Sequence, residues 1–168
     1  MATRTRRRGA AAVGKAATRS AKSATAASLA AQRAQAARLS RALTALAHGL
    51  PNPWDESTDY FHGFVAPLPA NTALDPESLR GALGIGARYH IDLSPAGPRL
   101  AAVGAGDQTW GEDIAGGFRQ LTTVMQATLR DLSLAFARGN GVVRVRVWLF
   151  GRSEDGTLVG LRSTSTET

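Results

Sequence analysis

Two stretches of the chain place apolar residues three and four positions apart, the spacing of one face of an α-helix. The first begins near Ser28 and is stopped by Gly49 and Pro51. Its stripe consists of leucines at Leu39, Leu43, Leu46 and Leu50. Alanine, the strongest helix former, fills most of the remaining positions, so we expect an amphipathic helix that ends before residue 51.

The second stretch predicts a longer helix. Its start at residues 109–112 has the form of a capping box, in which Thr109 and Glu112 satisfy unpaired backbone amides. Its apolar stripe consists of Ile114, Phe118, Leu121, Met125, Leu129, Leu132 and Phe136. Arg138 and Gly139 have the charge and the conformational freedom of a helix C-terminus. We therefore expect one helix that continues to residue 139 and turns its stripe toward the core.

Strand signals lie between and after these helices. Apolar side chains alternate with others from Val143 to Phe150, and a turn containing Asp155 and Gly156 separates this stretch from a second strand at residues 157–164. We also expect strands at residues 60–65, 88–93 and 99–103, the last two joined by a turn at 94–98. A short helix that begins with proline is predicted at residues 76–83.

The residues of the alternate face indicate how the layers are arranged. Trp148 and Phe150 lie on the opposite side of their strand from Val147 and Leu149, so both faces of the sheet need cover. The fold class that follows is α+β, with a mainly antiparallel sheet and helices on both faces.

Charge divides the chain into two parts. Residues 1–45 hold ten basic residues and no acid, whereas residues 46–168 hold ten arginines and thirteen acids, a net charge of −3. Residues 1–27 have too few large apolar side chains to form a core, so we expect them to be a disordered tail before a domain at 28–168.

The tail has three readings. A cationic segment binds nucleic acid phosphates by releasing counterions, and an Arg-, Ser- and Ala-rich segment without acids is typical of organelle targeting peptides. The third reading is a solvated tail with no dedicated role. The candidate nucleic-acid-binding residues are Arg4, Arg6, Arg7, Arg8, Lys15, Arg19 and Lys22.

The chain has few of the residues that usually form catalytic sites. The chain has no cysteine, three histidines and no lysine after Lys22, and its glycine pairs at 84–86 and 104–106 complete no nucleotide-binding motif. Acidic pairs at 112–113 and 154–155 are expected from a helix start and a turn alone. We expect a protein that is not an enzyme and has neither a cofactor nor a metal of its own; a hydrolase is the least favoured alternative.

Three groups of residues resemble the nuclease A inhibitor family. At the C-terminus, Val145 to Gly151, the pattern G-x-L-x-G at 156–160 and the final Glu167 and Thr168 match the family's ending. Trp110, Glu112 and Asp113 resemble its entry into a long helix, and Gly49, Leu50, Glu56, Ser57, Asp59 and Tyr60 resemble its acidic stretch. The resemblance covers residues 28–168 and is essentially absent over 66–106.

The resemblance implies an α-β-α sandwich that inhibits a Mg²⁺-dependent, sugar-non-specific endonuclease of the ββα-metal type. It also implies that the C-terminal Thr168, preceded by Glu167, enters the nuclease active site, where its hydroxyl meets the metal. An acidic-loop glutamate is implied to pair with a nuclease arginine; Glu56 is the matching position, although the extra residue Thr58 leaves a neighbouring acid as the alternative.

Two functions therefore remain after the sequence is considered. The first is an inhibitor in the cytoplasm, with organelle targeting by the tail as the alternative location. The second is a nucleic-acid-associated protein that binds through the tail and whose inhibitor-like body is inert.

Overall fold

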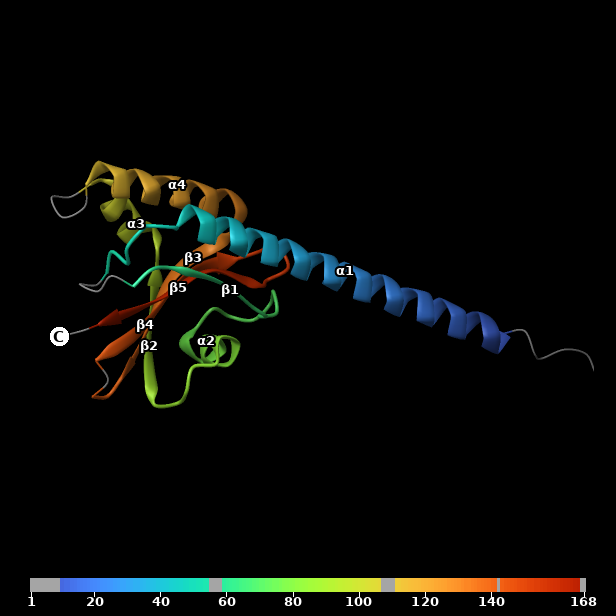
Figure 1. The fold of residues 1–168 in the computed structure, drawn as a ribbon. Coiled ribbons are helices and arrows are strands. Elements are labelled where there is room, and N and C mark those ends of the chain that lie inside the picture. The colour runs from blue at the N-terminus through green and yellow to red at the C-terminus, as the bar shows by residue number, and fades with distance from the viewer. Residues whose placement is uncertain (1–9, 55–58, 107–110, 142, 167–168) are drawn as a thin grey trace, which may run out of the picture. The chain divides into compact units, whose positions relative to one another are not determined.

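A five-stranded antiparallel sheet forms the centre of the fold, with strands in the order β1-β5-β4-β3-β2 (Figure 1). The computed structural model describes residues 10–54, 59–106, 111–141 and 143–166. The helices are α1 (Ala10–Leu46), α2 (Pro76–Leu83), α3 (Gly97–Gly104) and α4 (Glu112–Thr128). The strands are β1 (His62–Ala66), β2 (Tyr89–Pro95), β3 (Arg130–Gly139), β4 (Arg144–Arg152) and β5 (Leu158–Thr166).

The chain divides into two units, Met1–Gln35 and Ala36–Thr168, and the sheet belongs to the second. In the first unit, α1 begins at Ala10, whereas the sequence predicted a helix only from Ser28. Alanine, which has a high helix propensity, is frequent in this segment. Disorder of residues 1–27 stays a prediction. Residues 1–9 lie outside the described residues. No helix in the described ranges is long and apolar enough to cross a membrane.

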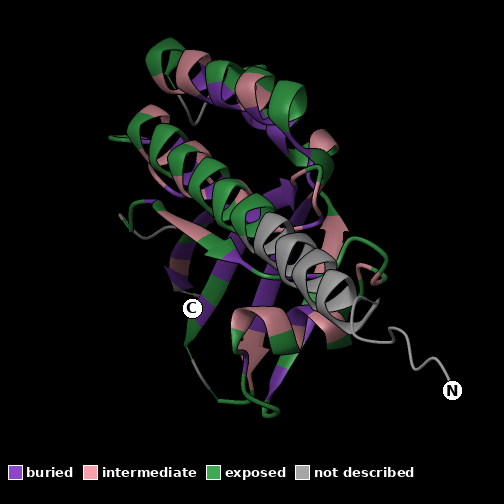
Figure 2. Ribbon diagram, turned by 90° about the vertical axis from the view of Figure 1, so that its right-hand side faces the viewer, coloured by how far each residue is buried: buried purple, intermediate pink, exposed green. Residues whose placement is uncertain are grey.

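The first face of the sheet packs against α3, α4 and the part of α1 that lies in the second unit. Leu43 of α1, Leu100 of α3 and Phe118 of α4 are buried in one cluster with the sheet residues Val147 and Leu149. The buried residues are drawn in purple in Figure 2. Leu39, Leu46 and Leu50 also pack in this cluster, so the predicted leucine stripe is confirmed as core-facing.

The second face is covered by α2. Leu79 of this helix is fully buried with Trp148 and Phe150, the two residues that predicted a covered second face. Asp75 caps α2 by accepting from the Ser78 amide at 2.8 Å, and Pro76 occupies its first turn. Helices on both faces of an antiparallel sheet confirm the predicted fold class.

The prediction of a strand at residues 99–103 is wrong, because this segment belongs to helix α3. Pro98 lies in the first turn of α3, and Leu100, Val103 and Gly104 are its buried residues. These positions have the i, i+3, i+4 spacing of one helix face. A five-residue apolar run is too short to separate this pattern from a strand.

The predicted second helix is also too long. Helix α4 begins after Gly111, which caps it without a side-chain hydrogen bond, and Thr109 of the predicted capping box lies outside the described residues. The helix ends at Thr128, and Leu129 has extended backbone. Residues 133–137 are all buried, as expected of an interior strand with both faces covered, so β3 replaces the last three turns of the predicted helix.

Candidate functional site

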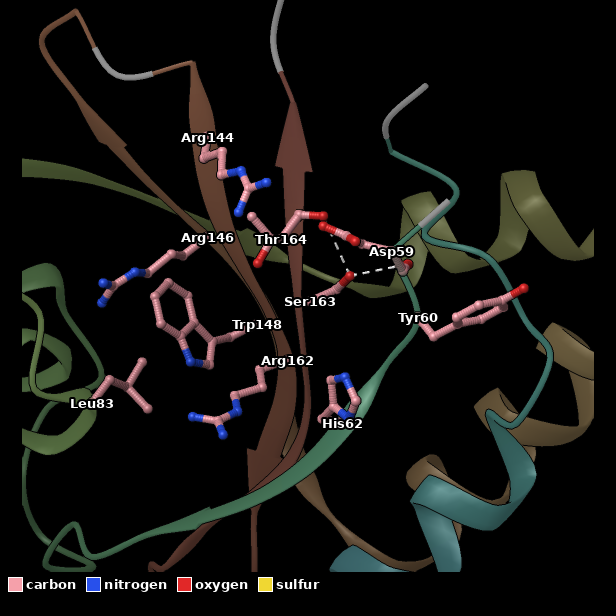
Figure 3. A pocket seen from close by; sticks show the side chains of 10 residues that line it. All are labelled: Asp59, Tyr60, His62, Leu83, Arg144, Arg146, Trp148, Arg162, Ser163 and Thr164. Atoms are coloured by element: carbon pink, nitrogen blue, oxygen red, sulfur yellow. Dashed lines mark hydrogen bonds between the residues drawn. The ribbon is translucent and has the colours of Figure 1, made fainter. Parts of the chain in front are cut away.

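A pocket of about 560 Å³ opens on the α2 side of the sheet, where β4 and β5 run past the end of β1 (Figure 3). It is lined by Asp59, Tyr60, His62, Leu83, Arg144, Arg146, Trp148, Arg162, Ser163 and Thr164. All of these residues belong to the second unit of the chain.

Three arginines form a row along this pocket. Arg144, Arg146 and Trp148 alternate along β4 and therefore share one face, and Arg162 of β5 pairs in register with Trp148. All three arginine side chains are exposed. We call Arg144, Arg146 and Arg162 the arginine row. Residues 46–168 have a net negative charge, so an excess of basic residues in this part of the chain does not explain the grouping of three arginines.

The arginine row differs in its partners from most other arginines of the body. Among the described residues, ion pairs link Arg80 with Glu77, Arg119 with Glu112, and Arg138 with Asp92, and none includes the arginine row. Arg130 and Arg152 donate hydrogen bonds to backbone carbonyls instead. Asp59 is the acidic residue among those that line the pocket.

Aromatic rings lie beneath and beside the arginine row. Trp148 is 6% exposed and forms part of the core on the α2 side. The Arg146 guanidinium carbon lies 5.4 Å from the centre of the Tyr89 ring, and the corresponding carbon of Arg88 lies 5.2 Å from it. Arg88 therefore extends the positive surface from β4 toward β2.

The rim of the pocket joins two segments that are distant in sequence. The Ser163 hydroxyl, on β5, donates a 3.2 Å hydrogen bond to the backbone carbonyl of Asp59. Asp59 directly follows residues 55–58, and Tyr60 forms an isolated bridge with Pro51. The C-terminal strand is thus attached to the end of the predicted acidic loop.

The residues predicted to contact a nuclease lie outside the described residues. They are Glu56, Glu167 and Thr168. The same holds for the tail residues Arg4, Arg6, Arg7 and Arg8, and for the side chains of Lys15, Arg19 and Lys22.

The arginine row was missed as a candidate site by sequence reasoning. The alternation of Arg144 and Arg146 with valines was visible, and it placed them on the face of Trp148. The position of Arg162 beside them depends on the β4–β5 register, which the turn alone did not supply. The signal that was overlooked is the presence of two arginines on a strand face that is predicted to be covered and where apolar residues are expected.

The shifted pKa values of two carboxyl groups outside the pocket have local structural causes. Hydrogen bonds from Ser78 hold the pKa of the Asp75 carboxyl below its ordinary value. Partial burial raises the pKa of Asp155, but hydrogen bonds from Ser153 and Thr157 outweigh it, and the net pKa is lowered. Among the described residues, no group of three or more His, Cys, Asp or Glu side chains is arranged to hold a metal ion. The three exposed guanidinium groups that line the pocket are suited to bind an anion.

The sequence matches no protein-family model and no curated protein. The resemblance to the nuclease A inhibitor family accordingly rests on the residues named for it above.

Proposed function

We propose that the chain is a protein inhibitor of a Mg²⁺-dependent, sugar-non-specific endonuclease and that it acts by occupying the active site of that enzyme. The sequence motifs at 110–113 and 145–168 support the family, and the sandwich architecture agrees with what the family resemblance implies. The observation that carries the proposal is the hydrogen bond between Ser163 and Asp59.

This hydrogen bond joins the anchors of both predicted contact segments. Glu56 lies three residues before Asp59, and Glu167 lies four residues after Ser163. An acidic loop and a chain end that meet one catalytic cleft must start from neighbouring points on the inhibitor. The short sequence distance from each joined anchor to its contact residue supports that requirement.

The charges of these segments suit a nuclease active site. Such a site attracts phosphate, and carboxylates reproduce its negative charge. The Thr168 hydroxyl and the Glu167 carboxylate carry hard oxygen donors, the ligands that Mg²⁺ prefers. Thr168 is therefore proposed to approach the metal of the target, and Glu56 to pair with a cationic side chain beside it.

The test is DNA cleavage by a purified ββα-metal non-specific nuclease, titrated with the full chain, with the chain ending at Glu167 and with Glu56→Gln. Glu77→Gln, on the exposed surface of α2, is the matched control. We expect stoichiometric inhibition that weakens at least about tenfold, or about 1.4 kcal/mol, without Thr168 and also with Glu56→Gln. Glu77→Gln is expected to inhibit as the unchanged protein does.

Two results would count against the proposal. Absence of inhibition by the full chain, with circular dichroism confirming a folded protein, would reject this nuclease class as the target. Full inhibition by the chain that ends at Glu167 would support the inhibitor function but show that Thr168 has no role in it.

The second candidate is nucleic acid binding through the basic N-terminal segment. It is favoured by α1, on which Arg33, Arg38 and Arg41 are exposed and which has no acid in its sequence. Binding of this kind weakens steeply with salt and is expected to fall when Arg6, Arg7 and Arg8 are replaced by glutamine in the full chain. Nuclease inhibition is expected to be unchanged by the same replacement, which separates the two candidates.

A further inference from the structure

We propose that the arginine row binds the phosphates of a single-stranded nucleic acid, at a site distinct from the N-terminal segment. This inference does not depend on the nuclease inhibitor proposal, because it rests on the arginines of β4 and β5 and not on the acidic loop or the C-terminal residues. Its carrying observation is a set of three exposed guanidinium groups, on neighbouring strands, that have no ion pair within the described part of the chain.

The spacing of the row suits a linear polyanion. Residues two apart on a strand are separated by about 6.7 Å, and the row extends over four residues of β4, or about 13 Å. Arg162 stands beside Trp148 at one end, Arg146 lies between, and Arg144 marks the other end. A single phosphate would be met by one or two of these groups, whereas a chain of phosphates can meet all three.

The chemistry of the row favours phosphate. Guanidinium groups bind phosphate oxygens through two parallel hydrogen bonds and remain charged at any physiological pH. His62 pairs in register with Arg162 and lies on the pocket lining, so it adds a further donor beside the row. The planes of the guanidinium groups also offer stacking surfaces to unpaired bases.

A protein partner fits this surface less well. The centre of a protein interface is usually apolar and rich in exposed aromatic residues. The apolar and aromatic residues that line this pocket are Trp148, Leu83 and Tyr60. Trp148 is buried and Leu83 packs with the core on the α2 side, whereas Tyr60 is exposed at the rim, with its ring directed away from the arginine row (Figure 3). A recess with its cations inside also admits a flexible single strand more readily than a rigid duplex.

The experiment measures fluorescence anisotropy of a labelled oligothymidylate of about 12 nucleotides with the full chain, over a range of salt concentrations. The test variant replaces Arg144, Arg146 and Arg162 by glutamine. The matched control replaces Arg99, Arg119 and Arg130, which are also exposed, lie in the same unit of the chain but outside the pocket, and remove the same charge. Thermal unfolding of each variant shows whether the fold is retained.

We expect the test variant to bind at least about tenfold more weakly. We also expect the slope of log affinity against log salt to fall by about 2, because each lost phosphate contact on a single strand contributes about 0.7. If the triple variant does not fold, Arg144→Gln and Arg162→Gln are measured singly, and each is expected to weaken binding about threefold.

The proposal is overturned if the control variant loses as much affinity as the test variant, because binding would then follow total charge. Tighter binding to a duplex of the same length would overturn the single-strand assignment. Tighter binding to polyglutamate of equal charge would replace nucleic acid by an acidic protein partner.

Discussion

Gly63 of β1 lies so close to Thr44 of α1 that a Cβ atom at position 63 would stand 2.2 Å from the Thr44 hydroxyl oxygen. The Ser40 hydroxyl and carbonyl oxygens would lie 2.6 and 2.8 Å away. Thr44 itself donates a 2.8 Å hydrogen bond to that carbonyl. The absence of a side chain at Gly63 is therefore what lets the C-terminal part of α1 rest on the edge of the sheet.

Gly63→Ala is expected to lower the free energy of unfolding by about 1–3 kcal/mol, the usual cost of overpacking a close contact. Urea unfolding measures the change. Gly81→Ala is the control, because Gly81 lies in helix α2 with nothing within 4 Å of a Cβ atom. It is expected to raise the free energy of unfolding by about 0.5–1 kcal/mol, the helix propensity of alanine over glycine. Equal effects at the two positions would mean that α1 does not approach β1 as described.

Arg152 and Arg162 are expected to differ sharply in their effect on stability. Arg152 is 8% exposed and donates hydrogen bonds to the carbonyls of Ala70 at 3.0 Å and Thr72 at 2.5 Å. Charge-assisted hydrogen bonds of this kind contribute about 1.5–3 kcal/mol, so Arg152→Gln is expected to cost about 2 kcal/mol or more. Arg162→Gln is expected to change stability by less than about 0.5 kcal/mol, as surface substitutions do. Chemical denaturation of both variants makes the comparison, and a large cost at Arg162 would assign the arginine row a structural role.

Asp155 predicts a pH dependence of stability in the β4–β5 turn. Its carboxylate accepts hydrogen bonds from the hydroxyl of Ser153 and from Thr157, whose hydroxyl lies 2.8 Å away. Because these bonds lower the folded-state pKa of Asp155, its stabilisation is present above the unfolded pKa of about 3.9 and is lost as the pH falls through the folded value. At neutral pH, we expect the free energy of unfolding of the unchanged protein to exceed that of Asp155→Asn by about 1 kcal/mol.

This advantage is expected to shrink as the pH falls below about 4, which unfolding curves over a pH series would measure. Ser153→Ala removes one donor to the carboxylate and should reduce the pH-dependent part of the difference. A stability difference between the unchanged protein and Asp155→Asn that stays constant down to the lowest pH would contradict the prediction.

The sequence predicted most elements of the fold because their periodicity is clear. Helix α2 has the predicted bounds, and the β4–β5 hairpin follows the alternation from Val143 and the turn at Asp155 and Gly156. The errors lie where one pattern satisfies two structures. The apolar stripe of α4 continues with the same spacing through Leu132 and Phe136, which are strand residues.

The site was less predictable than the fold for a related reason. Arg144 and Arg146 are visible as an alternation, but the row needs Arg162, and only strand register places it there. The hydrogen bond between Ser163 and Asp59 links positions 104 residues apart, and no local sequence pattern predicts it.

The junction between α4 and β3 gives a last prediction. Asp131 has a φ of 53°, the one non-glycine residue with positive φ among those described, and the register of β3 with β4 shifts between Arg130 and Ser133. The left-handed conformation costs a residue with a Cβ atom about 1–2 kcal/mol, although aspartate tolerates it better than alanine.

The Asp131 backbone carbonyl also accepts a 2.8 Å hydrogen bond from the Ser133 hydroxyl, which fixes the turn independently of the aspartate side chain. Asp131→Gly is therefore expected to match or exceed the stability of the unchanged protein, and Asp131→Ala to be less stable than Asp131→Gly by about 1 kcal/mol. Urea unfolding of the three proteins tests the order; alanine as stable as glycine would mean that the chain passes from helix to strand without a left-handed residue.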